Sequence, residues 1–437
     1  MSNISNNLNI KSPMISRIQD EIKLNKEEAV SKFWKEIEKI GTPIFEEIEG
    51  DDKYNLITFL VREEDEVENI VCFSIFVTED IKEGLLERIE DTNIYYKSYK
   101  ILKGIRETYN FIKNNPLTPK DPIENIFKYK DLVFSDPLNS KHFFWEAEGF
   151  KCPLSEIISP EAPPQPWYGE RPNIDYGKVD KFISYSEILN GKRQILVYIP
   201  PNYSKDHSPY HFLLLFDGLL FEETTKLSST LDNLIADNKI PPLVAIMVEN
   251  FLSSSIARRA GELGGPNPKF VEYIIKELLP WVHKNFNITT NPSQSVIAGA
   301  SYGGIASTSI AFKHPEIFGN VLSMSGGFFW YPGAEIYLKR VNELENFDHW
   351  WSKEDEKEGE WLARQFAQSE RLPLKLYLDV GILEETDPTG LFISNRHFRT
   401  VLQAKGYPFS YVEFLGGHDF VCWRGSIADG LIFLIGK

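Results

Sequence analysis

A serine flanked by glycines is the clearest candidate for chemistry in this sequence. The stretch Gly299-Ala300-Ser301-Tyr302-Gly303-Gly304 has the form G-x-S-x-G. An apolar run, residues 295–298, precedes it and a helical pattern, residues 305–313, follows it; this strand–turn–helix setting exposes a nucleophilic serine at a sharp turn. Glycine neighbours let the flanking segments pass without Cβ clashes, and the start of the helix stabilises developing negative charge. We therefore predict that Ser301 is a nucleophile, against the alternative of a tight glycine turn without chemistry.

A serine nucleophile needs a general base, and position in the chain singles out one of the 8 histidines. His418 lies in the stretch Leu415-Gly-Gly-His-Asp, directly after the predicted strand 409–414. That strand is the last one predicted, so His418 falls on a loop at its carboxyl end. The other histidines fall in helical patterns, before a strand, or in the segment that joins the two parts of the chain. We therefore predict His418 as the base.

The acid that orients this base should follow the preceding strand, because the chain order of such a site is serine, acid, histidine. Three carboxylates come after the predicted strand that ends at residue 380: Glu384, Glu385 and Asp387. Glu384 is our first choice because it comes soonest after the strand. Glu385 and Asp387 remain alternatives, and so do Asp419 beside the histidine and a Ser–His pair that works without an acid. The acid would hold the imidazole tautomer and stabilise the imidazolium.

Attack by a serine on a carbonyl also needs backbone N–H groups that bind the developing oxyanion. The Tyr302 N–H, directly after the nucleophile, is one candidate. The second should come from the loop after the predicted strand 212–216, where the sequence reads Asp217-Gly218-Leu219. Because Gly218 can adopt unusual backbone geometry, we predict the Leu219 N–H as the second donor.

Four further residues indicate a site that could accept negative charge. Arg258 and Arg259 follow the predicted strand 243–248. Trp423 and Arg424 come shortly after the predicted base. We place both groups on loops at the sheet edge that carries the serine. They could be ordinary solvated charge, or they could form a local electropositive pocket for an anionic substrate.

The elements that position these residues follow an alternating pattern from about residue 179 onward. Apolar runs alternate with helical patterns, which predicts a mostly parallel sheet with helices on both faces. Together with the serine turn, this arrangement is typical of an α/β-hydrolase. In such folds the site lies at the carboxyl ends of the strands. The predicted strands are residues 182–188, 194–199, 212–216, 243–248, 295–298, 321–324, 374–380 and 409–414. The predicted helices are residues 224–236, 268–285, 305–313, 391–405 and one from 421 onward.

The first part of the chain has a different pattern. A helix is predicted after Asn25, which caps it, and before Gly41, which ends it. Short runs at 55–62, 69–77, 95–101 and 108–112 are rich in β-branched and aromatic residues, which predicts a small all-β, Ig-like sandwich. Prolines spread through 116–173 predict a largely irregular connection. We therefore divide the chain into residues 1–165, with the helix, the β-sandwich and the proline-rich linker, and residues 166–437, the catalytic α/β-hydrolase domain.

Composition excludes several classes of protein. The 437 residues are 42% hydrophobic and 25% charged, which is usual for globular proteins. A net charge of −16 argues against a nucleic-acid-binding protein. No apolar run reaches the ~18 residues of a membrane span, the start of the sequence lacks a signal-peptide pattern, and the 3 cysteines suit neither a disulfide framework nor a zinc site. We expect a cytoplasmic protein without a membrane or nucleic-acid partner.

Taken together, the motifs resemble those of the enterochelin (enterobactin) esterases, in the esterase D-like branch of the α/β-hydrolases. Besides the all-β first part, the stretches that carry the resemblance are Gly-Ala-Ser301-Tyr-Gly-Gly, Arg-Arg259-Ala-Gly-Glu-Leu, Gly-Ile-Leu-Glu384 and Gly-Gly-His418-Asp-Phe-Val-Cys-Trp423-Arg424-Gly. The last stretch is the most specific. The resemblance covers most of the chain but leaves its start unplaced.

The resemblance implies a reaction. It is the hydrolysis in the cytoplasm of a catecholate trilactone siderophore such as enterobactin, in its ferric form, which helps to release the iron. Ser301 would be the nucleophile, His418 the base and Glu384 the acid. Iron would arrive with the substrate, so we expect no cofactor and no metal held by the protein.

The resemblance also implies substrate contacts. Arg259 and Trp423 match the family's substrate-binding positions. The substrate is anionic and aromatic, so Arg258, Arg259 and Arg424 could pair with catecholate oxygens, and Trp423 could stack on a catechol ring.

Two other functions remain open. The first is a feruloyl-type or other small-ester carboxylesterase with a carbohydrate-binding-like β domain, which would have no need of the arginine pair. The second is a binding protein on a hydrolase scaffold, without catalysis, which the presence of Ser301, His418 and nearby acids disfavours.

Overall fold

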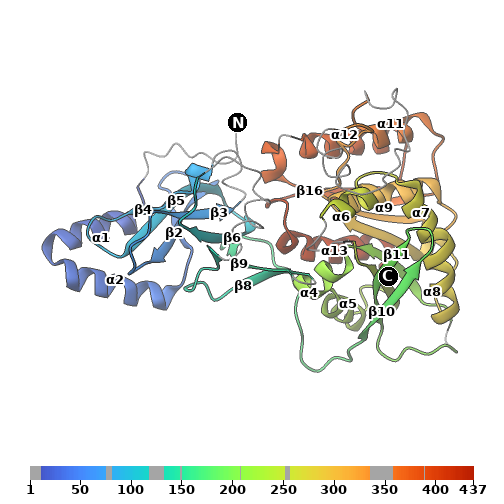
Figure 1. The fold of residues 1–437 in the computed structure, drawn as a ribbon, viewed down its shortest axis with the longest axis horizontal. Helices are drawn as coiled ribbons and strands as arrows, with labels where there is room; N and C mark the ends of the chain where they lie inside the picture. Colours follow the sequence, from blue (N-terminus) through green and yellow to red (C-terminus); the bar gives the residue numbers. More distant parts are fainter. Residues whose placement is uncertain are drawn as a thin grey trace. The chain divides into compact units, whose positions relative to one another are not determined.

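The computed structural model describes residues 11–74, 81–117, 132–147, 150–206, 208–250, 256–334, 358–387 and 389–437. The chain forms two compact units, drawn in Figure 1. The N-terminal unit comprises Met1–Trp145, Lys151–Pro164 and Leu415–Val421. The catalytic unit comprises Glu146–Phe150, Gln165–Phe414 and Cys422–Lys437. In the described part of the chain, no helix is both long and apolar enough to cross a membrane.

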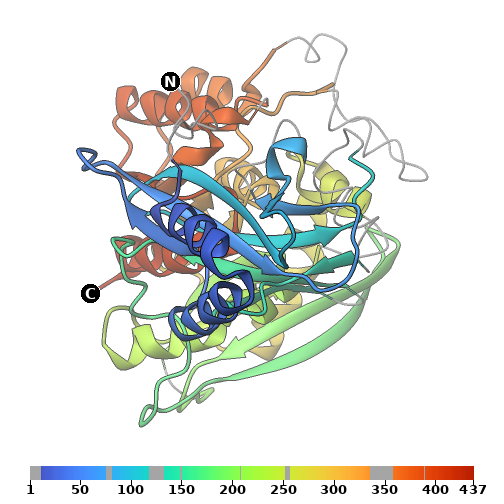
Figure 2. The ribbon, with the colours of Figure 1, turned by 90° about the vertical axis from the view of Figure 1, so that its left-hand side faces the viewer.

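Two helices open the N-terminal unit. The predicted helix is α2 (Lys26–Ile40), and the Asn25 side chain accepts a hydrogen bond from the Glu28 N–H as expected of a cap. Helix α1 (Pro13–Leu24), capped by Ser12, was not predicted. Figure 2 shows the two helices side by side against the strands of the same unit. Their apolar residues share one core with strand residues such as Leu60, because neither amphipathic helix is stable without a partner face.

The strands of this unit form two antiparallel sheets. The first has the order β1-β2-β5-β4 and the second β3-β6-β9-β8, with β7 beside β6. The ring centroids of Phe59 in β2 and Tyr109 in β6 lie 4.7 Å apart, so the faces of the two sheets pack together. The bounds are β1 Ile44–Glu47, β2 Tyr54–Arg62, β3 Ile70–Ser74, β4 Glu87–Arg88, β5 Ile94–Leu102, β6 Arg106–Lys113, β7 Val133–Phe134, β8 His142–Ala147 and β9 Phe150–Ile158. Residues 75–77 of one predicted run lie outside the described residues.

Strands β7, β8 and β9 correct the expectation of an irregular segment over residues 116–173. The prediction was wrong because a proline removes only one backbone N–H donor, and a strand tolerates it where that donor is not needed for pairing. Pro153 lies in β9 ahead of the residues that pair with β6, which are Ser155–Ile158. Placed there, it costs no bond of that pairing. Residues 118–131 of the same segment lie outside the described part of the chain.

The catalytic unit is built on an eight-stranded sheet with the order β10-β11-β13-β12-β14-β15-β16-β17. The pairs from β13 to β17 are parallel, and β10 and β11 run antiparallel at one edge. All eight predicted strands are present, and the α/β architecture is confirmed. The bounds are β10 Lys178–Ser186, β11 Gly191–Ile199, β12 His211–Phe216, β13 Leu243–Val248, β14 Ser295–Ala300, β15 Asn320–Met324, β16 Lys375–Gly381 and β17 Phe409–Phe414.

Helices cover both faces of this sheet (Figure 1). Val321 in β15 packs in the same core as α9. Leu322, which follows Val321 in β15, lies close to Gly430 of α13. Successive residues of a strand point to opposite faces, so α9 and α13 lie on opposite sides. The bounds are α4 Gly218–Thr225, α5 Leu227–Ala236, α6 Ile256–Leu263, α7 Pro268–Tyr273, α8 Leu279–Asn285, α9 Tyr302–Lys313, α11 Trp361–Gln368, α12 Leu391–Ala404 and α13 Phe420–Ile435.

The helices of this unit differ from the prediction in two ways. The pattern over 224–236 predicted one helix, but α4 and α5 meet at Lys226, which has a left-handed φ of 53°. Helices α6 and α11 have only 8 residues each, too few for a periodic pattern to stand out. The unpredicted α6 carries two of the candidate site residues.

Candidate active site

Ser301 has the backbone geometry of a nucleophile elbow. It joins β14 to α9 with φ 58° and ψ −120°, a conformation that is strained for a residue with a side chain. Its N–H donates to the Met324 carbonyl at 2.8 Å, and its carbonyl accepts from the N–H groups of Gly304 and Gly327 at 3.0 Å each. These bonds fix the strained turn from both sides.

Glycines next to Ser301 are required by close backbone approach. A Cβ on Gly299 would lie 2.5 Å from the carbonyl carbon of Gly303. A Cβ on Gly304 would lie 2.5 Å from the Ser323 hydroxyl and 2.9 Å from the Gly326 Cα. The steric reason given for the motif is therefore confirmed.

The side chain of Ser301 remains partly exposed although its surroundings are buried. All of β14 and most of α9 are buried. The Ser301 hydroxyl makes no capping bond to the first turn of α9, which leaves it for other chemistry. A strained, half-exposed serine at the start of a buried helix is the arrangement that attack on a carbonyl requires.

Glu384 is a buried carboxylate held in one position. It lies in the 3-10 turn Ile382–Thr386 after β16 and is 2% exposed. Its Oε1 accepts from the Gly381 N–H at 2.7 Å and from the Ser325 hydroxyl at 2.6 Å. The Trp423 indole N–H in turn donates to the Ser325 Oγ at 3.1 Å. A short chain of hydrogen bonds therefore orients this acid.

The two alternative acids in the same turn are held differently. Glu385 is exposed. Asp387 is half-buried and accepts from the Thr389 N–H at 2.7 Å. Neither has the buried, multiply bonded setting of Glu384, so the geometry favours Glu384 among the three.

Ser325 also joins Glu384 to a second buried acid. It follows β15 with a left-handed φ of 45°, and its N–H donates to the Asp379 backbone carbonyl at 2.9 Å. The same N–H lies 3.3 Å from the Asp379 Oδ1. Burial is the main cause that raises the Asp379 pKa to about 8, and the charge of Glu384 adds to it against a bond from Ser426. At neutral pH this side chain is therefore mostly protonated.

His418, the predicted base, lies on the segment Leu415–Val421 after β17. That segment belongs to the N-terminal unit, whereas Ser301 and Glu384 belong to the catalytic unit. His418 is half-buried and stands between the buried residues Gly417 and Asp419. Asp419, the further alternative acid, accepts from Thr108 and from the Val421 N–H.

The predicted oxyanion donors have different settings. Tyr302 is the first residue of α9, directly after the nucleophile, and its role stays a prediction. The Leu219 N–H instead donates to the Glu249 Oε2 at 2.7 Å. This bond counts against Leu219 as a donor, because Glu249 would first have to release the amide. Sequence reasoning missed it because Glu249 follows a different strand, β13.

Arg259 lies on α6 and not on a loop, which corrects the prediction. Its Nε and Nη2 donate to the Asp217 Oδ1 and Oδ2 at 2.8 Å each. The Nη2 also lies 3.4 Å from the Ala300 carbonyl. Asp217 has a left-handed φ of 57° and stands at the start of α4. Arg259 therefore connects the loop after β12 with the residue that precedes the nucleophile.

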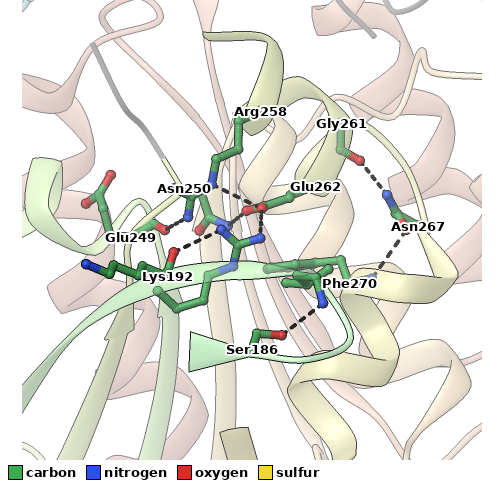
Figure 3. Close-up of polar contacts among 11 residues, drawn as sticks. Ser186, Lys192, Glu249, Asn250, Arg258, Gly261, Glu262, Asn267 and Phe270 are labelled. Carbon is green, nitrogen blue, oxygen red and sulfur yellow. Dashed lines mark hydrogen bonds and ion pairs between the residues drawn. The ribbon is translucent and has the colours of Figure 1, made fainter. Parts of the chain in front are cut away.

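Arg258, also on α6, belongs to a polar cluster shown in Figure 3. Its Nε donates to the Glu262 Oε1 at 3.1 Å, and its Nη2 donates to the Glu249 carbonyl at 3.0 Å. Asn250 and Arg193 also contact the Glu262 carboxylate, at 2.8 and 2.9 Å. The cluster anchors α6 to Glu249 and Asn250, which follow β13, and Arg258 shares the Glu262 carboxylate with Arg193.

Trp423 and Arg424 lie near the start of α13 and not on a loop, which corrects their predicted placement. Trp423 is 4% exposed, and its N–H bonds to Ser325. Arg424 donates to the Gln165 Oε1 at 2.7 Å and lies over the Tyr168 ring, 3.8 Å from its centroid. All four predicted substrate contacts thus have partners inside the protein, and their role in binding substrate stays a prediction. Within the described ranges, no cluster of histidine, cysteine or acidic residues could hold a metal ion.

Comparisons with known proteins fit this geometry. The sequence model of the family described as "Putative esterase" matches residues 186–434. The model described as "Enterochelin esterase, N-terminal" matches residues 56–168.

Two of the known relatives bear on the substrate. An iron(III) enterobactin esterase of Dickeya dadantii is 25% identical over 433 residues, covering 92% of each chain. An endo-1,4-beta-xylanase/feruloyl esterase of Xylanibacter ruminicola is 30% identical over an alignment of 233 positions, which covers 48% of this chain and 30% of that protein.

Among solved structures, the ferric enterobactin esterase of Salmonella typhimurium matches with a TM-score of 0.71 and 23% identity, covering 90% of this chain and 96% of that one. At that identity the match supports the fold, with both units included. The esterase model matches more than half of the chain, and the enterochelin esterase model matches its N-terminal β strands. The chain therefore belongs to the esterase family, as a member of its enterochelin esterase group.

Proposed function

We propose that this protein is a serine esterase that hydrolyses the ester bonds of a catecholate trilactone siderophore and thereby helps to release its iron. The observation that carries the proposal is the strained conformation of Ser301, with φ 58° and ψ −120°, between β14 and α9. Backbone strain of this kind is retained where a serine must be presented for attack.

The proposed mechanism is acyl transfer in two steps. The Ser301 Oγ attacks the ester carbonyl while His418 takes its proton, and the alcohol leaves with that proton. Water then attacks the acyl-enzyme in the same way and frees the acid. The backbone N–H of Tyr302 binds the oxyanion, helped by the start of α9.

Glu384 is the proposed acid of this mechanism. Its fixed carboxylate holds His418 in the tautomer that accepts a proton. This role is supported by the burial of Glu384 and its bonds from Gly381 and Ser325.

The substrate class rests on similarity over nearly the whole chain. The relative from Dickeya dadantii, named an iron(III) enterobactin esterase, shares both units with this chain. We therefore propose an enterobactin-like substrate in its ferric form, with iron entering only as part of it. A cytoplasmic location, the absence of a cofactor and an Ig-like topology of the N-terminal strands belong to the same proposal.

Contacts between the substrate and Arg258, Arg259, Trp423 and Arg424 are the least supported part of the proposal. Each side chain already has a partner in the chain. For Arg259, the bidentate bond to Asp217 favours a structural role, which a substrate comparison can test as described in the Discussion.

The experiment that tests the function is product analysis with wild-type protein and two variants. Ser301→Ala should abolish hydrolysis of ferric enterobactin, by a factor on the order of 10³ or more, and leave binding intact. Ser309→Ala, on the same helix and buried, is the matched control and should retain turnover. Mass spectrometry of the linear products gives the readout, and full turnover by Ser301→Ala would reject the nucleophile.

A second candidate substrate class is a feruloyl-type ester. The relative from Xylanibacter ruminicola favours it, but that match spans only 48% of the chain. Methyl ferulate and a neutral p-nitrophenyl ester therefore belong in the same panel. Preferential cleavage of methyl ferulate over every trilactone would select this alternative.

A further inference from the structure

The segment that carries His418 departs from the unit that carries the nucleophile. The chain leaves the catalytic unit after Phe414, passes through the N-terminal unit as Leu415–Val421, and returns to the catalytic unit at Cys422. The reason for this excursion lies in contacts between the segment and strand β6.

Backbone contacts hold the beginning of the segment. The Arg106 N–H in β6 donates to the Leu415 carbonyl at 3.0 Å, and Arg106 forms a parallel β-bridge with Gly416. Arg106 is itself fixed, because it pairs with Ile158 in β9 and its Nη2 donates to the Pro163 carbonyl at 2.8 Å. The segment therefore starts as a short extension of the N-terminal sheet.

A side-chain hydrogen bond holds the residue that follows His418 in the chain. The Thr108 hydroxyl in β6 donates to the Asp419 Oδ2 at 2.5 Å, across 311 positions of sequence. Thr108 is 5% exposed and Asp419 is 3% exposed. A hydroxyl bond to a carboxylate at this distance is charge-assisted and strong, and burial keeps water from competing for it.

Asp419 also forms hydrogen bonds with the backbone on both sides of His418. Its Oδ1 accepts from the Val421 N–H at 2.8 Å, and its own N–H donates to the Gly417 carbonyl at 2.9 Å. Gly416 and Gly417, directly before His418, would otherwise give the backbone wide freedom. Fixed points at Gly416 and Asp419 leave His418 little room to move.

We propose that Thr108 and Asp419 are positioning residues, which hold the backbone around His418 in one conformation. This inference rests on the proposed function, in which His418 is the base. In this proposal the all-β unit contributes to catalysis, because Thr108 in β6 restrains the loop that carries His418. A displacement of a catalytic group by about 1 Å is enough to cost on the order of 10²-fold in rate.

The test uses full-length protein and a neutral p-nitrophenyl ester, so that it does not depend on the siderophore. Thr108→Val removes the donor and keeps the shape, and Thr108→Ser restores the donor. Thr58→Val is the matched control, because Thr58 is buried in the same unit and its hydroxyl pairs with Ser98 at 2.8 Å. Each variant is assayed for kcat, KM, Tm and the rate of Ser301 labelling by a phosphonate.

The expected result is that Thr108→Val lowers kcat and the labelling rate by about 10- to 100-fold with little change in KM. Thr108→Ser should recover most of this loss, Asp419→Asn should match Thr108→Val, and Thr58→Val should affect only Tm. Equal kcat and labelling for Thr108→Val and Thr58→Val would overturn the proposal. If wild-type protein is not labelled at Ser301 at all, the proposed function fails instead, so the two failures are distinguishable.

Discussion

Arg259 binds the carboxylate of Asp217 through two hydrogen bonds of 2.8 Å each. The pair joins α6 to the residue at the start of α4, and the same guanidinium lies 3.4 Å from the carbonyl of Ala300, just before the nucleophile. The Asp217 charge raises the Arg259 pKa in spite of burial. The ion pair therefore links α6 to the start of α4, and removing Arg259 would leave the buried carboxylate of Asp217 uncompensated.

We predict that Arg259→Ala lowers kcat/KM by about 10- to 100-fold on a neutral p-nitrophenyl ester and on a catecholate trilactone alike. The reason is that a structural ion pair stabilises the backbone next to Ser301 whatever the substrate is. A contact between Arg259 and the substrate would matter only for anionic substrates. Asp217→Asn should have a similar effect, and the double variant should lose less than the product of the two. A loss confined to the trilactone would restore Arg259 as a substrate contact.

Glu384→Gln should lower kcat by on the order of 10²-fold or more, because the amide cannot stabilise a charged imidazolium. Glu385→Gln and Asp387→Asn are the matched controls from the same turn, and we expect them to stay within a few-fold of wild type. Steady-state kinetics on one ester give the comparison. Three mild effects would mean that the serine and histidine work without this acid.

Trp423→Phe separates a role in orienting Glu384 from a role in stacking on substrate. Phenylalanine keeps an aromatic ring but loses the N–H that bonds to Ser325. We expect kcat to fall about 2- to 10-fold with KM unchanged, since the roughly 0.5–1.5 kcal/mol of one hydrogen bond is removed. Ser325→Ala should lower kcat at least as much. Unchanged kcat in Trp423→Phe would argue for the ring alone, and therefore for contact with substrate.

Asp379 should make stability depend on pH. Its pKa is about 8 in the folded protein against an ordinary value of 3.8, so between these values the folded state binds more protons than the unfolded state. The free energy of unfolding therefore falls as pH rises through this window.

Asp379→Asn removes this titration and is the variant that isolates it. We expect the stability of wild type relative to Asp379→Asn to decrease from pH 5 to pH 9 in urea unfolding. A difference that stays constant over that range would show that Asp379 is ionised in the folded protein.

The strands of the catalytic unit and the residue types of the candidate site could be predicted from the amino-acid sequence, whereas α6, which carries Arg258 and Arg259, could not. Continuous apolar runs mark the buried strands β12 to β16, because strands covered on both faces tolerate few polar residues. The glycines around Ser301 are readable because only glycine permits the close approaches found there. Chain order then placed Glu384 after β16 and His418 after β17.

The partners of the charged and buried polar side chains became visible in the folded structure alone. The pairing of Arg259 with Asp217, of Leu219 with Glu249 and of Thr108 with Asp419 joins residues that are 42, 30 and 311 positions apart. No local pattern encodes such pairs, because a charge in a sequence looks the same whether it faces solvent, a substrate or a buried partner. Strand and helix periods arise from neighbouring residues, whereas the settings of the acid, the oxyanion loop and the histidine loop arise from which distant segments the fold brings together.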